Sequence, residues 1–178
     1  MENTLAGDIK NAPEIADMNR EVKSFFSWQP SRSLLASIRA YQNASNAIFG
    51  TQLFLKKCAM VRYRVWSIVT GAEIPVNLKI GGGLLLPHPN GIVIHCDSKI
   101  GFNCLIFQQV TIGSRDSPPP TIGNHVDIGA GAKILGQITI GDYAKIGANA
   151  VVLTDVPAYA TAVGVPAKIY INKRINTY

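Results

Sequence analysis

The chain has 178 residues, 47% of them hydrophobic, a size and composition that fit one main domain with a continuous core. A net charge of +6 without an RNA- or DNA-binding motif argues against nucleic acid as a partner, and no apolar run reaches the roughly 18 to 20 residues of a transmembrane segment. Cys58, Cys96 and Cys104 lack CxxC spacing, and acidic residues close to Met1 argue against a signal peptide. We therefore expect a cytoplasmic protein without a disulfide framework or a metal site.

Residues 1–70 are expected to form a helical region. The pattern predicts a short helix over 14–26, a second helix after Pro30 with Ser31 as its N-cap, and a longer helix over 47–69. The longer helix offers apolar side chains for burial: Phe49, Leu53, Leu55, Met60, Val61, Val65 and Ile68. Because such helices have too little core to stand alone, we expect them to cap the domain that follows or to contact another subunit.

From residue 74 to 152 an aliphatic residue returns at every sixth position, with two slips. The positions are Ile74, Ile80, Leu86, Ile92, then Ile94, Ile100, Ile106, Ile112, then Ile122, Ile128, Ile134, Ile140, Ile146 and Val152. A period of six fits neither a helix nor a single strand, but it fits a parallel β-helix of hexapeptide repeats. We expect about five coils over residues 71–170, followed by a tail over 171–178.

Glycine follows the aliphatic residue in many of the repeats. The positions are Gly81, Gly101, Gly113, Gly123, Gly129, Gly141 and Gly147. Because glycine adopts positive φ without strain, we expect these residues to turn the corners of the coil.

Two interruptions of the repeat are candidates for the functional site. The first spans residues 86–94 and holds His88 between two prolines; the second is a four-residue insertion within 113–121. Loops on a rigid scaffold often carry function. An imidazole that titrates near neutrality suits a general base for a hydroxyl group, although an isolated histidine can equally be structural or merely exposed.

The region 71–170 closely resembles the left-handed β-helix acyltransferases, and among them the serine acetyltransferase branch. The matching segments are residues 87–94, Gln108, residues 110–113, 128–136, 144–148 and 164–169. The resemblance implies left-handed coils and acyl transfer from acetyl-CoA to a hydroxyl group. It also implies a homotrimer, because sites in such proteins need two chains to close.

The resemblance also implies roles for individual residues. His88 is expected to be the general base, with Glu73 orienting it, and Pro87, Asn90, His95 and Gln108 are expected to line the acceptor site. Acetyl-CoA would lie between neighbouring subunits, on backbone groups of two alanines that are 18 residues apart, one full coil. The expected acetyl-CoA contacts are Gly113, Ser114, Ala130, Ala148 and Lys168, although small residues here could simply serve tight corners.

Two departures from the branch bear on the acceptor. Serine acetyltransferases carry an acidic residue where this chain has Pro87, and a second histidine where it has Pro119. A neutral, proline-framed pocket favours a hydroxyl of a sugar or of a cell-surface polysaccharide precursor over free L-serine. L-Serine as the acceptor is the alternative, and a non-catalytic β-helix scaffold is a third hypothesis.

Overall fold

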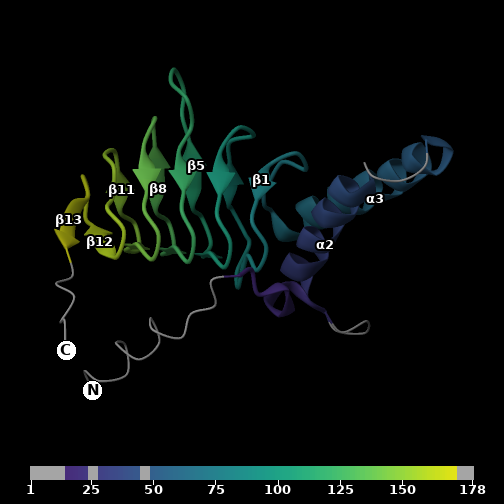
Figure 1. Ribbon diagram of the computed structural model, residues 1–178, viewed down its shortest axis with the longest axis horizontal. Coiled ribbons are helices and arrows are strands. Elements are labelled where there is room, and N and C mark those ends of the chain that lie inside the picture. Colours follow the sequence, from purple (N-terminus) through teal and green to yellow (C-terminus); the bar gives the residue numbers. More distant parts are fainter. Residues whose placement is uncertain (1–14, 24–27, 45–48, 172–178) are drawn as a thin grey trace.

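The computed structural model describes residues 15–23, 28–44 and 49–171. The chain forms a left-handed β-helix of about five coils. Figure 1 shows the coils stacked side by side, with the helices at the N-terminal end. This confirms the predicted fold. None of the helices in these three ranges is long and apolar enough to cross a membrane.

Three flat sheets form the sides of the β-helix. The first contains β1 (Lys79–Ile80), β3 (Lys99–Ile100), β6 (Thr121–Ile122) and β9 (Thr139–Ile140). The second contains β4 (Leu105–Ile106), β7 (Asp127–Ile128), β10 (Lys145–Ile146), β12 (Ala160–Val163) and β13 (Lys168–Ile171). The third contains β2 (Val93–Ile94), β5 (Thr111–Gly113), β8 (Lys133–Leu135) and β11 (Val151–Val152). Strands pair in parallel, except that β13 turns back antiparallel on β12.

The hexapeptide aliphatic residues fill the inside of these coils. Ile94, Ile112, Ile134 and Val152 stack in register on the third sheet, and all four are buried. Successive members are 18 residues apart, except for Ile112 and Ile134, between which four extra residues leave the coil. Each fully buried aliphatic side chain contributes about 1.5–3 kcal/mol, so the repeat itself supplies the stabilising core.

The repeat glycines serve close contact between coils rather than positive φ. An ideal Cβ on Gly101 would lie 2.4 Å from the carbonyl oxygen of Gly123, and one on Gly141 would lie 2.4 Å from the backbone nitrogen of Ala158. None of the seven repeat glycines has positive φ. The predicted role was therefore wrong. At six of the seven positions an ideal Cβ would lie within 2.6 Å of another atom, so no side chain fits there; Gly113 is the exception, with its nearest contact at 3.8 Å.

Polar and aromatic residues take the left-handed conformation at the corner between the first and second sheets. Asn103, His125, Tyr143 and Tyr159 have φ between 55° and 63°. The rings of His125 and Tyr143 stack with centroids 4.5 Å apart, and Tyr143 and Tyr159 stack at 4.9 Å. Aromatic stacking of this kind offsets part of the backbone strain.

The helical region differs in detail from the prediction. Of the predicted range 14–26 the structure describes residues 15–23, and there it has only the 3₁₀ helix η1 (Met18–Glu21). Helix α2 (Pro30–Asn43) begins with its proline at the first helical position and has Gln29 at the N-cap without a side-chain bond, so Ser31 is not the cap. Helix α3 spans Phe49–Thr70; residues 47–48 of the predicted helix are not described.

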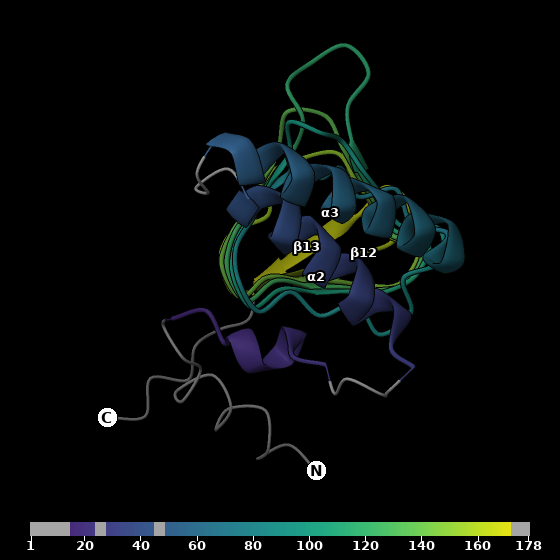
Figure 2. The same cartoon turned by 90° about the vertical axis from the view of Figure 1, so that its right-hand side faces the viewer.

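Helix α2 closes the N-terminal end of the β-helix, as expected for a cap (Figure 2). Leu34, Leu35 and Ile38 are fully buried and join the main core. Arg39 donates to the carbonyl of Ile80 at 2.8 Å and forms an ion pair with Glu21 at 2.9 Å. The end of the first sheet is therefore covered by side-chain donors as well as by apolar contacts.

The apolar residues of α3 are mostly not buried. Of the predicted set, Leu53, Leu55, Val61, Val65 and Ile68 are exposed, Met60 is half-buried, and the side chain of Phe49 is not described. The helix instead contacts its surroundings through Ala59, Tyr63, Trp66 and Thr70. Apolar residues occur around nearly the whole helix, so periodicity could not identify the buried face.

Candidate functional site

The predicted site residues lie along two edges of the third sheet. We call the corner between the second and third sheets the His88 edge; it contains residues 86–92, Gln108, Ala130 and Ala148. The corner between the third and first sheets is the loop edge; it contains His95 and residues 113–120. One flat side of the β-helix, about five residues or roughly 15 Å wide, separates them.

His88 lies on a bulge of the His88 edge. Leu85 aligns with Leu105 and Val93 aligns with Thr111, so eight residues on this coil match six on the next. The two extra residues displace Pro87 and His88 outward, and both are exposed. The slip that the sequence showed in the repeat therefore presents the imidazole to solvent at the edge.

The other predicted residues of this edge form a straight track. The N–H of Gln109 donates to the carbonyl of Asn90 at 2.9 Å, Gly131 donates to Gln108 at 2.8 Å, and Asn149 donates to Ala130 at 2.8 Å. Asn90, Gln108, Ala130 and Ala148 thus occupy equivalent positions on successive coils. Within the described residues, the N–H groups of Ala130 and Ala148 donate to no other backbone group.

Two polar groups extend this track. The side-chain oxygen Oε1 of Gln108 is buried and has no hydrogen-bond partner in the described part of the chain. An unpaired buried acceptor is costly, so it is suited to a donor from a ligand or from another chain. Lys168 lies near the far end of the track and is exposed. It pairs with Val163 in the sheet, and Val163 contacts Gly147, the neighbour of Ala148: its Cγ1 lies 2.5 Å from the position that a Cβ on Gly147 would take.

A groove of about 690 Å³ lies along the loop edge and the outer face of the third sheet. His95, Gly113 and Ser114 line it, as do residues 115–117 of the projecting loop. Outward side chains of the third sheet and of the residue after it form further walls, which were not among the predicted site residues: Val93, Thr111, Leu135 and Leu153. These residues alternate with the buried aliphatic positions along the strands, and this pattern in the sequence could have identified them as outward-facing.

His95 is held in one orientation within this groove. The backbone N–H of Asp97 donates to its Nδ1 at 3.2 Å, so a neutral ring carries its proton on Nε2. The atoms of His95, Cys96 and Asp97 lie within 4.8 Å of one another, but Cys96 and Asp97 are exposed. Because the Nδ1 lone pair is already used, this cluster does not amount to a metal site.

His88 and Glu73, the predicted catalytic dyad, are not hydrogen-bonded or ion-paired to each other through their side chains within one chain. In the described part of the chain, neither His88 nor Glu73 has a side-chain hydrogen bond or ion pair, and both side chains are exposed. The backbone of Glu73 pairs with the third sheet, its N–H donating to Ile92 at 2.8 Å. Glu73 therefore lies one coil before His88, the placement that the resemblance implied, and its role stays a prediction.

Two groups in the β-helix have clearly raised pKa values. Burial raises the pKa of the Cys104 thiol to about 11, which keeps it protonated and unsuited to nucleophilic attack. Cys104 is buried, whereas Cys96 is exposed. Burial also raises the pKa of Asp127, partly offset by the positive charge of Lys145. Neither group lies on the two candidate edges.

Comparison with known proteins identifies the family. A model described as bacterial transferase hexapeptide (six repeats) matches residues 119–154. A serine acetyltransferase from Staphylococcus xylosus is 38% identical over 160 residues, covering 84% of this chain and 74% of the relative. One from Synechococcus elongatus is 42% identical over 106 residues, covering 57% of this chain and 43% of the relative.

A solved structure agrees with these relatives. A serine acetyltransferase in complex with CoA is 40% identical, with a TM-score of 0.67, over 80% of this chain and 58% of that chain. The chain thus spans less than two thirds of the Synechococcus and CoA-bound proteins, but about three quarters of the Staphylococcus relative. The hexapeptide coils, the conserved fold and this extent of identity show that the chain belongs to the serine acetyltransferase family of hexapeptide-repeat transferases.

Proposed function

We propose that the chain is an acetyl-CoA-dependent O-acetyltransferase with His88 as its general base and the hydroxyl of L-serine as its acceptor. The observation that carries the proposal is the His88 edge. It presents an exposed imidazole at one end of a track of backbone N–H groups and a cation, Lys168, near the other end. A long, thin ligand with a terminal anionic part, such as CoA, suits such a track. The solved relative is a serine acetyltransferase in complex with CoA.

In the proposed reaction, neutral His88 takes the proton of the acceptor hydroxyl as its oxygen attacks the thioester carbonyl of acetyl-CoA. The tetrahedral oxyanion is stabilised by a backbone or side-chain donor. The intermediate collapses with cleavage of the carbon–sulfur bond, and protonated His88 returns its proton to the CoA thiolate. Glu73 fixes the imidazole orientation and stabilises its positive form, and the dyad tightens when substrate is bound.

The comparisons change the order of the two acceptors that the sequence suggested. Pro87 and Pro119 favoured a sugar, but the relatives are named serine acetyltransferases, and the similarity extends over 84% of this chain in one case. Nothing in these relatives supports a polysaccharide precursor. We therefore place L-serine first, and a sugar hydroxyl is retained only because Pro87 supplies no charge beside His88.

The site is proposed to form between chains of a homotrimer. A single chain places His88 and the Ala130–Ala148 track on one edge, and His95, Gly113 and Ser114 on the other. A rotationally symmetric assembly of parallel β-helices can bring the His88 edge of one chain against the loop edge of the next. The acetyl-CoA contacts predicted from the sequence, which divide between the two edges, would then meet in one groove.

Acetyl-CoA consumption with thiol release tests the acceptor. Saturable turnover with L-serine supports the proposal. Turnover with a sugar or nucleotide sugar, and none with L-serine, would replace it with glycan O-acetylation. Absence of turnover with every acceptor, together with absence of acetyl-CoA binding by calorimetry, would favour the non-catalytic scaffold.

The role of His88 is tested by substitution. We expect His88→Ala to retain the fold and CoA binding but to lower kcat by about 10² or more, because the proton acceptor is lost. His125→Ala is the matched control: this histidine lies in the aromatic stack away from both edges, so its loss should lower Tm and leave kcat near normal. A His88→Ala enzyme with near-normal kcat would contradict the assignment.

A further inference from the structure

The positive charge of the chain is concentrated in its helical region. Between Glu21 and Glu73 the sequence contains no Asp or Glu. The same segment holds seven of the seventeen Lys and Arg residues: Lys23, Arg32, Arg39, Lys56, Lys57, Arg62 and Arg64. The rest of the chain, with ten basic and eleven acidic residues, is nearly neutral.

Helix α3 carries an exposed apolar stripe within this basic region. Phe54, Cys58, Val61, Val65 and Ile68 follow one another at alternating steps of four and three residues, which places them along one line of a helix. We call these five residues the α3 stripe. The four large side chains are 69%, 63%, 52% and 83% exposed for Phe54, Val61, Val65 and Ile68, so this line is uncovered along its full length.

The stripe points away from the body of the protein. The residues that α3 buries, Ala59 and Thr70, lie on the other side of the helix, with Tyr63 and Trp66 half-buried between them. Figure 1 shows α3 extending outward beyond the end of the β-helix. The stripe is therefore accessible to a large flat partner.

Cations border the stripe on both sides. At 3.6 residues per turn, Lys57 and Arg64 fall along one margin and Arg62 along the other. All three side chains are exposed, and none has a salt-bridge partner among the described residues. Lys56, in contrast, turns toward α2, with its Nζ 5.8 Å from the ring centroid of Tyr41.

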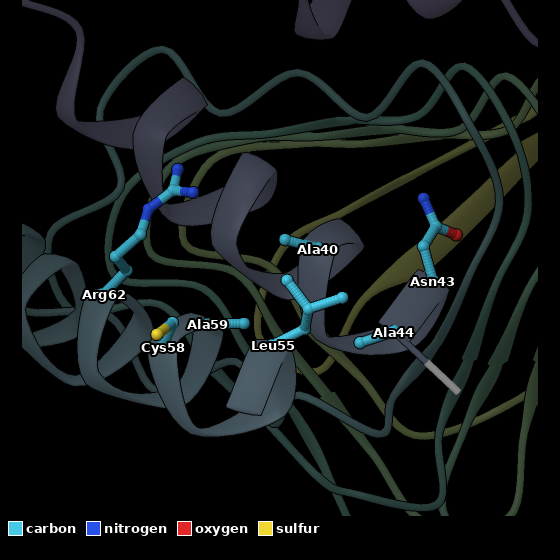
Figure 3. Close-up of a pocket in the computed structure, with 7 residues that line it drawn as sticks. All are labelled: Ala40, Asn43, Ala44, Leu55, Cys58, Ala59 and Arg62. Carbon is cyan, nitrogen blue, oxygen red and sulfur yellow. The ribbon is translucent and has the colours of Figure 1, made fainter. Parts of the chain in front are cut away.

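A small apolar pocket opens beside the stripe. It has a volume of about 300 Å³, and its walls come from α2 and α3: Ala40, Asn43, Ala44, Leu55, Cys58, Ala59 and Arg62. Figure 3 shows Arg62 and Asn43 at opposite ends of the pocket, with Leu55 and Ala40 between them. An apolar interior with a guanidinium at its rim suits a hydrocarbon chain whose head group is anionic.

We propose that the exposed face of α3 is a docking surface for an anionic lipid bilayer. The helix lies in the plane of the interface, the α3 stripe enters the boundary between head groups and acyl chains, and Lys57, Arg62 and Arg64 contact lipid phosphates. The pocket beside Arg62 receives part of one acyl chain. The proposal is independent of the acceptor that the catalytic site takes.

The charge pattern favours lipid over a second copy of the chain. In a self-pairing of α3 along the stripe, a cationic margin of one helix would approach a cationic margin of the other in either orientation. No acidic residue of α2 or α3 could compensate. A bilayer instead offers phosphates on both sides of the helix at once. The pocket adds a site that a flat helix–helix contact would leave empty.

Vesicle flotation tests the docking surface with full-length protein. We expect binding to vesicles of phosphatidylcholine and phosphatidylglycerol (3:1) and little binding to phosphatidylcholine alone. The double variant Val61→Glu/Val65→Glu should lose at least about tenfold in partitioning, because two apolar anchors become anionic. Ile171→Glu, at an equally exposed isoleucine on β13, is the matched control and should bind as the parent does.

A second pair of variants tests the electrostatic contribution to vesicle binding. Lys57→Glu/Arg64→Glu should lower binding by about tenfold or more at 0.1 M salt, whereas Lys79→Glu/Lys99→Glu, on the first sheet, should not. Equal binding of the parent to neutral and anionic vesicles would overturn the proposal. A parent protein that does not bind vesicles, together with a Val61→Glu/Val65→Glu variant of smaller assembly mass, would also overturn it. The α3 stripe would then be an interface between chains.

Discussion

At the residue scale, Cys104 shows how the β-helix suppresses the chemistry of a side chain. Its Sγ is buried 3.2 Å from the carbonyl oxygen of Gly123, and burial raises its pKa to about 11. We expect iodoacetamide at pH 8 to modify the exposed Cys58 and Cys96 within minutes and to leave Cys104 unmodified, as measured by mass spectrometry. Unfolded protein, in which all three thiols should react, is the control. Rapid modification of Cys104 in the folded protein would show that the coil opens there.

The repeat glycines lead to a second prediction at this scale. Gly101→Ala should destabilise the protein by about 2 kcal/mol, because its Cβ would meet the backbone of Gly123 at 2.4–2.5 Å, and backbone cannot move aside cheaply. At Gly113 an added Cβ would meet only the Cβ of His95, at 3.8 Å, so Gly113→Ala should be nearly neutral. Denaturant unfolding of both variants measures the contrast. Equal stabilities would show that coil spacing adjusts more readily than the structure suggests.

At the element scale, the sequence predicted the coils well and the helix faces poorly. Because each repeat stacks on the next, the spacing of Ile94, Ile112 and Ile134 in the sequence was enough to predict which residues pair in the third sheet. In α3 the apolar residues are too numerous to define one face. Which face is buried depends on the position of α2, and helix periodicity does not encode that position.

The same distinction holds for the elements of the candidate site. The spacing of 18 residues correctly placed Ala130 and Ala148 on adjacent coils, and the interruption of the repeat at residues 86–94 coincides with the bulge that exposes His88. The groove at the loop edge was only partly predicted. Its walls combine outward residues from β2, β5 and β8 and from the segment after β11, and a side-by-side arrangement of that kind emerges only once the coils are stacked.

At the scale of the whole molecule, the two edges constrain how active sites can be built. The β-helix is rigid, and its third sheet keeps His88 and Ser114 on opposite corners of one side. A conformational change within one chain would have to break the stacked aliphatic core to join them. In the proposed trimer, assembly would join the two edges without this cost, because each chain would present one edge to each of its two neighbours.

Mixed assemblies test this arrangement directly. His88→Ala removes the base from one edge. Gly113→Trp should fill the groove at the other without disturbing the core, since an added Cβ there would meet only the Cβ of His95, at 3.8 Å. Each variant alone should be inactive. If sites form between chains, trimers assembled from equal amounts of both should recover about one quarter of parental turnover, because one interface in four joins two intact edges. Recovery after co-expression, with separately folded variants mixed afterwards as the control, would establish the shared site; complete inactivity of verified mixed trimers would place the whole site within one chain.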